Sequence, residues 1–172
     1  MFRDALRVVE ETLRSYEEAR SREFPELSRV GIIAATIVSD VLVKIRSLMT
    51  TLSTIENSLE NPKQAVTKLC EGLIYVNDNK VTSVIRKAPF TSISYNKEED
   101  RISISSRRLS TSLKGATLEV RFRNYVTNLN ILAKEDLEKY ANIIKALASE
   151  KLELINYAIT ITESCRKKLG LR

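Results

Sequence analysis

Apolar residues in the first third of the chain recur at helical spacing. Phe2, Leu6, Val9, Leu13 and Tyr16 step by four and three positions, which predicts one helix over about 2–20. A second stripe begins after Pro25, a residue favoured in the first turn of a helix, and predicts a helix over about 26–59. The pair Asn61-Pro62 ends that stripe and predicts a short helix over 62–70.

The pattern changes from helical spacing to alternation at Gly72. Residues 72–87, GLIYVNDNKVTSVIRK, form two alternating runs around Asp78-Asn79, and this arrangement predicts a hairpin. Residues 90–108 contain a second pair of runs around 97–100, and ATLEVRFRNY (116–125) reads as a fifth strand. The segment SSRRLSTSLKG (105–115) reads as a hydroxyl-rich basic loop. Helical spacing returns near Leu132 and predicts a last helix over 132–169, ended by Gly170.

This order of elements predicts an α+β fold. It is a long-helix bundle with an inserted antiparallel sheet of three to five strands, in the order helix–helix–β-meander–long helix. A chain of 172 residues is long enough to bury a core and is most simply one domain. We expect a helical layer built from 1–70 and 126–172, with the β insertion at 72–124.

Two apolar stripes look too long to be covered within one small monomer. One stripe, on the second predicted helix, contains Val41, Ile45, Leu48 and Leu52, and the other, on the last helix, contains Leu147, Ile155 and Ile159. A last helix of this length would measure roughly 55 Å at 1.5 Å per residue. The stripes therefore predict a homo-oligomer assembled through the long helices, in the manner of a coiled coil.

The positive charge of the chain is concentrated in the β insertion. The formal net charge is +6, and residues 80–124 contain ten Lys or Arg against four Asp or Glu. The rest of the chain is therefore neutral, and the whole excess lies in the insertion. A local positive field of this kind attracts polyanions, of which nucleic acid is the commonest large example.

Alternation places candidate binding residues on the outer face of the sheet. In residues 116–125, Leu118, Val120 and Phe122 fall on one side, and Arg121, Arg123 and Tyr125 fall on the other. Arginines can bind phosphate oxygens, and exposed aromatic rings can stack on unpaired bases. The predicted nucleic-acid-binding residues are Arg86, Arg101, Arg107, Arg108, Arg121, Arg123, Tyr75, Phe90 and Tyr125.

Each of these assignments has a structural alternative. Outward Arg and Ser are typical of any solvated antiparallel sheet, and Arg on an edge strand also blocks aggregation. Tyr75 and Phe90 could instead cover the helices, and Tyr125 could support the junction into the last helix. The leading hypothesis is sequence-tolerant binding of single-stranded DNA or RNA. The alternative is an oligomeric interaction or assembly subunit that binds a protein partner and no nucleic acid.

Other function classes receive little support from the sequence. Histidine is absent, and there is no Gly-rich phosphate loop, nucleophile elbow or CxxC motif, so we expect no catalytic residue, metal, cofactor or small-molecule substrate. The most apolar run, 30–45, is short and contains Asp40, so we expect no membrane span. The charged N-terminus argues against a signal peptide and leads us to expect a cytoplasmic protein.

The two cysteines leave one question open. Cys70 and Cys165 are either free thiols in a reducing compartment or a bridge in a hyperthermophilic protein. Few Gln and Cys combined with many Lys, Arg, Glu and Ile are typical of thermophilic proteins.

The predicted layout also resembles known nucleic-acid-binding proteins. Helices around a small basic sheet are similar to the small archaeal single-strand-binding proteins of the ThermoDBP type. They are also similar to the helical-plus-sheet small subunits of some CRISPR surveillance complexes. The resemblance concerns arrangement alone, and it implies single-strand binding without assigning any residue.

Overall fold

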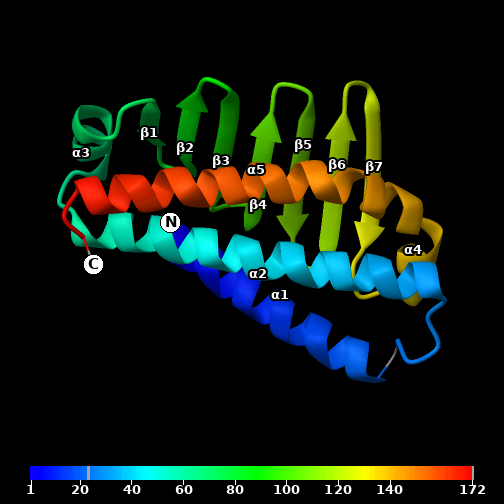
Figure 1. Cartoon of the computed structure of the whole chain (residues 1–172). Helices are drawn as coiled ribbons and strands as arrows, with labels where there is room; N and C mark the ends of the chain where they lie inside the picture. Colours follow the sequence, from blue (N-terminus) through cyan, green and yellow to red (C-terminus); the bar gives the residue numbers. More distant parts are fainter. Residues whose placement is uncertain (23, 172) are drawn as a thin grey trace.

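The chain folds into a sheet with helices packed on one of its faces (Figure 1). The computed structural model describes residues 1–22 and 24–171, without the side chains of 147–149 and 151. The predicted α+β class is confirmed. The elements are α1 Phe2–Arg22, α2 Arg29–Ser58, α3 Pro62–Leu69, β1 Leu73–Asn77, β2 Val81–Lys87, β3 Phe90–Asn96, β4 Arg101–Ser106, β5 Leu109–Lys114, β6 Thr117–Phe122, β7 Tyr125–Asn130, α4 Lys134–Lys139 and α5 Ala141–Lys168.

The sheet is a meander in which each strand pairs antiparallel with the next. The order is β1-β2-β3-β4-β5-β6-β7, with no crossover. Successive turns of a meander alternate between the two ends of the sheet. The β2–β3, β4–β5 and β6–β7 turns therefore lie together at one end, which is the upper edge of the sheet in Figure 1. The β1–β2, β3–β4 and β5–β6 turns lie at the other end.

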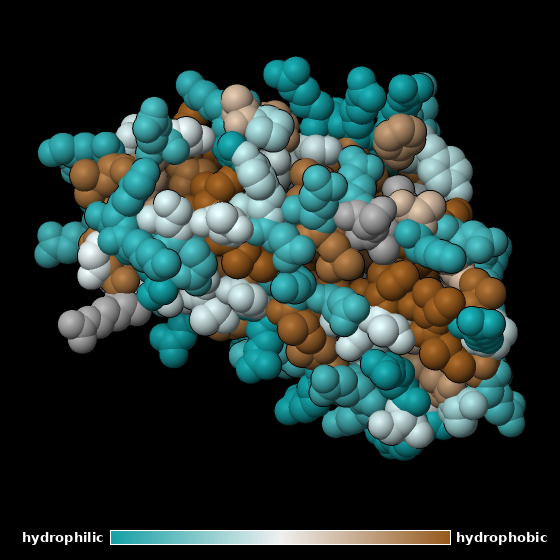
Figure 2. All heavy atoms as spheres, in the orientation of Figure 1, coloured by the Kyte–Doolittle hydropathy of each residue, from teal (hydrophilic) through white to brown (hydrophobic). Residues whose placement is uncertain are grey.

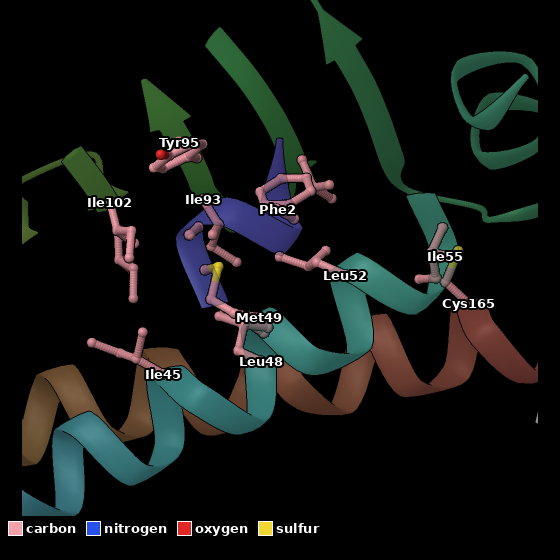
Figure 3. Close-up of a cluster of buried hydrophobic side chains, with 14 of the residues drawn as sticks. Phe2, Ile45, Leu48, Met49, Leu52, Ile55, Ile93, Tyr95, Ile102 and Cys165 are labelled. Atoms are coloured by element: carbon pink, nitrogen blue, oxygen red, sulfur yellow. The ribbon is translucent and has the colours of Figure 1, made fainter. Parts of the chain in front are cut away.

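The core lies between the inner face of the sheet and the helices. The stripe on α2, including Ile45, Leu48 and Leu52, packs against inward residues such as Ile93 and Ile102 (Figure 3). A second cluster of buried hydrophobic residues connects α1, α2 and α4 with Leu113 and Leu129 of the sheet. Helices α2 and α5 run side by side across the strands, as expected from their stripes (Figure 1).

The sheet has seven strands, so the prediction of three to five strands was wrong. The segment predicted as the loop 105–115 contains β5, whose Leu109 and Leu113 are buried while serines occupy the outward positions. Because Ser and Thr surround these two leucines, the alternation of apolar and polar residues typical of a strand was not apparent in the sequence. Strand β7, Tyr125–Asn130, was also missed, and it moves the end of the β insertion from 124 to 130.

The last predicted helix, 132–169, is two helices that meet at Tyr140. The carboxylate of Glu138 on α4 accepts hydrogen bonds from the Ser28 backbone N–H at 2.7 Å and from its hydroxyl at 2.5 Å. These bonds hold the pKa of Glu138 below its usual value. Ser28, rather than Pro25, marks the start of α2. A Cβ on Gly31 would lie 2.9 Å from the Glu138 carboxyl group, so glycine allows this close approach.

The apolar stripes that predicted an oligomer are covered within the monomer. Ile45, Leu48, Leu52 and Ile155 are all buried, because the sheet is wider than the sequence indicated and shelters both helices. Val41 and Ile159 are half-buried against the same core, so these described stripe residues give little support for an oligomer. Leu147, which also belongs to these stripes, has a side chain outside the described residues. A homo-oligomer stays a prediction without this support.

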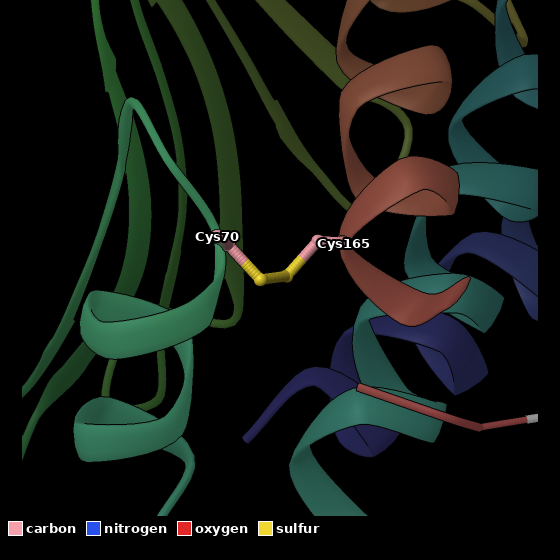
Figure 4. Close-up of a disulfide and its surroundings, with 2 residues drawn as sticks. All are labelled: Cys70 and Cys165. Carbon is pink, nitrogen blue, oxygen red and sulfur yellow. A yellow bond between two sulfur atoms is a disulfide. The ribbon is translucent and has the colours of Figure 1, made fainter. Parts of the chain in front are cut away.

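A disulfide joins Cys70 and Cys165 and answers the question left open by the sequence (Figure 4). Cys70 is the C-cap of α3, and Cys165 lies in the last turns of α5. Both residues are buried, and the bond spans 95 positions of sequence. The bond therefore ties the first strand of the sheet, which follows α3 directly, to the end of the C-terminal helix.

Candidate nucleic-acid interface

Three hairpin turns bring most of the predicted cations to one end of the sheet. Residues 86–91, 105–110 and 121–126 surround the β2–β3, β4–β5 and β6–β7 turns, and they contain six Lys or Arg and no Asp or Glu. The excess charge of the molecule is therefore gathered at this end. We call the following residues around these three turns the basic hairpin edge: Lys87, Phe90, Arg107, Arg108, Arg121, Phe122, Arg123 and Tyr125.

The opposite end of the sheet has no excess charge. Its turns, 77–80, 96–101 and 114–117, contain four cations and four carboxylates. Lys80 pairs with Glu98 at 3.2 Å, and Arg101 pairs with Glu99 at 3.1 Å and with Glu119 at 3.8 Å. Arg101, which the sequence grouped with the other candidates, therefore lies at the wrong end of the sheet and is already neutralised.

The cations of the basic hairpin edge are largely unpaired. Lys87, Arg107, Arg108 and Arg123 are exposed, and none of them forms an ion pair with a carboxylate of the described residues. Arg121 lies 3.5 Å from Glu119 and remains well exposed. Free cations at this density repel one another, so a polyanion that neutralises them would be bound favourably.

Strand register places these residues in one row. Lys87 pairs with Phe90, and extending the β3–β4 pairing by one residue sets Arg107 opposite Phe90. Extending the β5–β6 pairing by one residue sets Arg108 opposite Arg123. Neighbouring strands are about 4.8 Å apart, so the row from β2 to β7 is about 24 Å long.

Aromatic rings accompany the cations, and one of them, Tyr125, lies on a different face than the sequence predicted. Arg123 and Asn124 form the β6–β7 turn, which makes Tyr125 the partner of Phe122 and turns both toward the helix side of the sheet. Tyr125 and Arg121 therefore lie on opposite faces, contrary to the prediction. Both rings remain accessible, at 56% for Tyr125 and 39% for Phe122. Phe122, which the sequence placed on the side of Leu118 and Val120, is on that side but exposed, so it is a candidate interface residue that sequence reasoning missed.

Exposure of these rings follows from the length of the hairpins. The three turns extend past α5 in Figure 1, so the helix side of the sheet is uncovered near its end. The Arg123 guanidinium lies 5.4 Å from the centre of the Phe122 ring. Phe90 is half-buried and shares the outer face with Ser92 and Ser94, as predicted.

Serines cover the outer face next to the basic hairpin edge. One row across β3 to β6 is Ser92, Ser105, Ser110 and then Arg121. The next row, across β2 to β5, is Ser83, Ser94, Ser103 and Ser112. Short hydroxyl side chains leave this face flat and supply uncharged groups that can bind phosphate oxygens.

Tyr75 does not belong to the interface. The sequence predicted that Tyr75 faces outward, but it points inward and is 1% exposed. Its neighbours Ile74 and Val76 are both apolar, so the sequence pattern did not show which face Tyr75 occupies. Its hydroxyl donates to Glu56 at 3.0 Å, and the same carboxylate accepts from the Phe2 backbone N–H at 2.8 Å. Burial, followed by the charge of Glu56, raises the pKa of Tyr75.

Arg86 is likewise separated from the outer face. It shares the inner face with Thr82 and Val84, and its guanidinium lies 3.8 Å from the centre of the Tyr157 ring on α5. It occupies the same end of the sheet as the other cations, but its side chain lies on the opposite face, between the sheet and helix α5. Arg86 cannot join the row formed by Lys87 and Arg107.

The backbone at Arg123 allows one test of what this residue contributes. Its φ is +54°, a left-handed conformation that Asn and Gly adopt more readily than Arg. Arg123→Asn is therefore expected to raise the free energy of unfolding by about 0.5 kcal/mol and to weaken oligonucleotide binding. Chemical denaturation and fluorescence anisotropy measure the two effects. A variant that is more stable and binds unchanged would show that Arg123 makes no contact with the ligand.

Other kinds of site are not evident in the described part of the chain. None of its helices combines the length and apolarity needed to cross a bilayer. Among the same residues, no cluster of three or more His, Cys, Asp or Glu could hold a metal ion. Comparison with protein-family models, with curated proteins and with solved structures finds no match to this chain.

Proposed function

We propose that this protein binds single-stranded nucleic acid, DNA or RNA, along the basic hairpin edge, without catalysis and with little sequence preference. The observation that carries the proposal is the row of unpaired cations on three adjacent turns, with no carboxylate in the same turns. Phosphates would bind to Arg107, Arg108 and Arg123, and the serine rows would supply further donors.

The aromatic residues favour a single strand over a duplex. Tyr125 and Phe122 project from the last hairpin with much of their surface exposed, and Phe90, on β3, lies three strands from β6 on the other face. Unpaired bases can stack on such rings, whereas the paired bases of a duplex are already stacked. Stacking tolerates every base, because each one has a flat π-face, so we expect weak sequence preference.

A titration of labelled oligo-dT, monitored by anisotropy across a salt series, tests this proposal. Engagement of four phosphates would give a log–log slope of about −2.8, at about 0.7 per contact. Tyr125→Ala should lose about 1–3 kcal/mol of binding free energy and leave the slope nearly unchanged, because stacking releases no counterion. Equal affinity for duplex DNA would contradict the assignment to single strands. No binding even at low salt would exclude the function.

The second candidate function is an interaction or assembly subunit, and one observation favours it. Large apolar residues on α2 remain exposed, namely Val30, Ile32, Ile33 and Val43. Figure 2 shows hydrophobic atoms gathered over the half of α2 nearest α4. Light scattering at micromolar concentration distinguishes a self-associating chain from a monomer. The two functions are compatible if α2 forms the oligomer and the basic hairpin edge binds the strand.

A further inference from the structure

A cleft with charged residues in its lining lies beside the disulfide, at the same end of the sheet as the basic hairpin edge but on the helix side. It has a volume of about 250 Å³ and opens between the α3–β1 turn and the last turns of α5. A water molecule occupies about 30 Å³ in the liquid, so the cleft has room for a small solute. Its polar lining consists of Glu71, Arg86, Thr160, Ser164 and Lys168, and Gly72 leaves the entrance open.

Arg86 supplies a cation whose charge is not compensated by any carboxylate of the described residues. The residue projects from the inner face of β2, and its guanidinium is stacked on Tyr157. One guanidinium nitrogen, Nη1, is shielded from solvent and has no hydrogen-bond partner among the described residues. No carboxylate of the described chain forms an ion pair with Arg86. Water can accept hydrogen bonds from a guanidinium, but it cannot neutralise the charge.

Helix α5 supplies further groups that bind anions. Thr160, Ser164 and Lys168 are spaced four residues apart, so they lie on one face of the helix, and all three line the cleft. Lys168 is exposed and has no ion pair with any described carboxylate. Glu71 is the one acidic residue of the lining, so the two cations leave a net positive charge.

We propose that this cleft binds a phosphate group, as orthophosphate or as the end of a phosphate monoester. Two cations suit a dianion better than a singly charged carboxylate. Arg86, Lys168 and the Ser164 hydroxyl, which all line the cleft, can donate to phosphate oxygens, whereas the Thr160 hydroxyl already donates to the Asn156 carbonyl at 3.0 Å. Stacking on Tyr157 fixes the guanidinium plane before the ligand arrives. This site borders the basic hairpin edge, since the Lys87 backbone N–H donates to the Gly72 carbonyl at 3.3 Å, but it lies on the opposite face of the sheet and does not depend on the function proposed there.

Orthophosphate titrated by calorimetry at constant ionic strength tests the site, with chloride as the background anion. Wild-type protein should bind one phosphate per chain with a dissociation constant on the order of 1 mM. Arg86→Leu should weaken binding more than tenfold, and Lys168→Ser about fivefold. Lys145→Ser is the matched control, because it removes one charge from an exposed residue of α5 outside the cleft lining, and it should bind as wild type does.

Ser164→Ala with Lys168→Ser provides a second test if Arg86→Leu does not fold, because both residues line the cleft and lie on the exposed side of α5. Phosphate binding that is absent in wild type, or equal in all variants, would overturn the proposal. Competition by a 5′-phosphorylated dinucleotide, and not by its unphosphorylated form, would identify a nucleic-acid end as the source of the phosphate. Competition by neither would identify the free ion.

Discussion

Replacing Arg107 and Arg108 with Ala and Arg123 with Asn is expected to weaken oligo-dT binding about 100-fold at 0.1 M salt. Each phosphate contact with a single strand contributes about 0.7 to the log–log salt slope, which is about fivefold in affinity at that concentration. Loss of three contacts should also flatten the slope by about 2 units. All three side chains are exposed turn residues without a carboxylate partner among the described residues, so the fold should tolerate their removal.

The opposite end of the sheet provides a control with the same change in charge. Replacing Lys80, Lys97 and Lys114 with Ala also removes three positive charges, but from turns where carboxylates already balance the cations. This variant should keep nearly all of the affinity and the salt slope. Equal losses in the two triple variants would mean that net charge alone governs binding. The basic hairpin edge would then not be a site.

Reduction of the disulfide is expected to have the largest effect on stability. A cross-link that closes a loop of about 100 residues lowers the entropy of the unfolded chain and stabilises the native state by about 4–5 kcal/mol in the chain-entropy model. The Cys70–Cys165 bond spans 95 positions. Thermal unfolding with and without reductant should show a melting temperature lower by about 10–15 °C after reduction, at about 2–4 °C per kcal/mol.

A variant without the cross-link separates loss of the bond from side effects of the reductant. Cys70→Ala with Cys165→Ala should melt at a temperature near that of the reduced wild type, and reductant should not change it further. Thiol titration of the unfolded protein must confirm that reduction is complete, because both sulfurs are buried in the native state. An unchanged melting temperature after complete reduction would show that the bond stabilises the unfolded ensemble as much as the native one.

The helices and the first four strands could be predicted because their apolar residues repeat with a clear period. The α2 stripe steps by three and four, and β3 alternates cleanly, with Ile93 and Tyr95 inward. Strand β1 could not be oriented, because Ile74, Tyr75 and Val76 are all compatible with burial. What turns Tyr75 inward is its hydrogen bond to Glu56, 19 residues away, and no local pattern reveals it.

The sequence predicted which segment contains the cations of the candidate interface, but it did not predict how those cations are arranged on the sheet. The excess of Lys and Arg over Asp and Glu in 80–124 can be counted in the sequence. How these residues are distributed between the two ends of the sheet depends on which turns lie together in the fold. The β6–β7 turn at Arg123-Asn124 has no glycine to mark it, so the strand was extended through it and Tyr125 was assigned to the wrong face. The β5 strand was mistaken for a loop, because its outward positions are serines.

The meander makes this protein an electric dipole along its strands. Turns at the same end are separated in the sequence by turns of the other end, so the segment as a whole reads as mixed charge, while the folded sheet has one positive end and one neutral end. Such a molecule experiences a torque in the field of a polyanion and rotates as it approaches. The three basic turns would reach a nucleic acid first, so long-range orientation and short-range contact act at the same end.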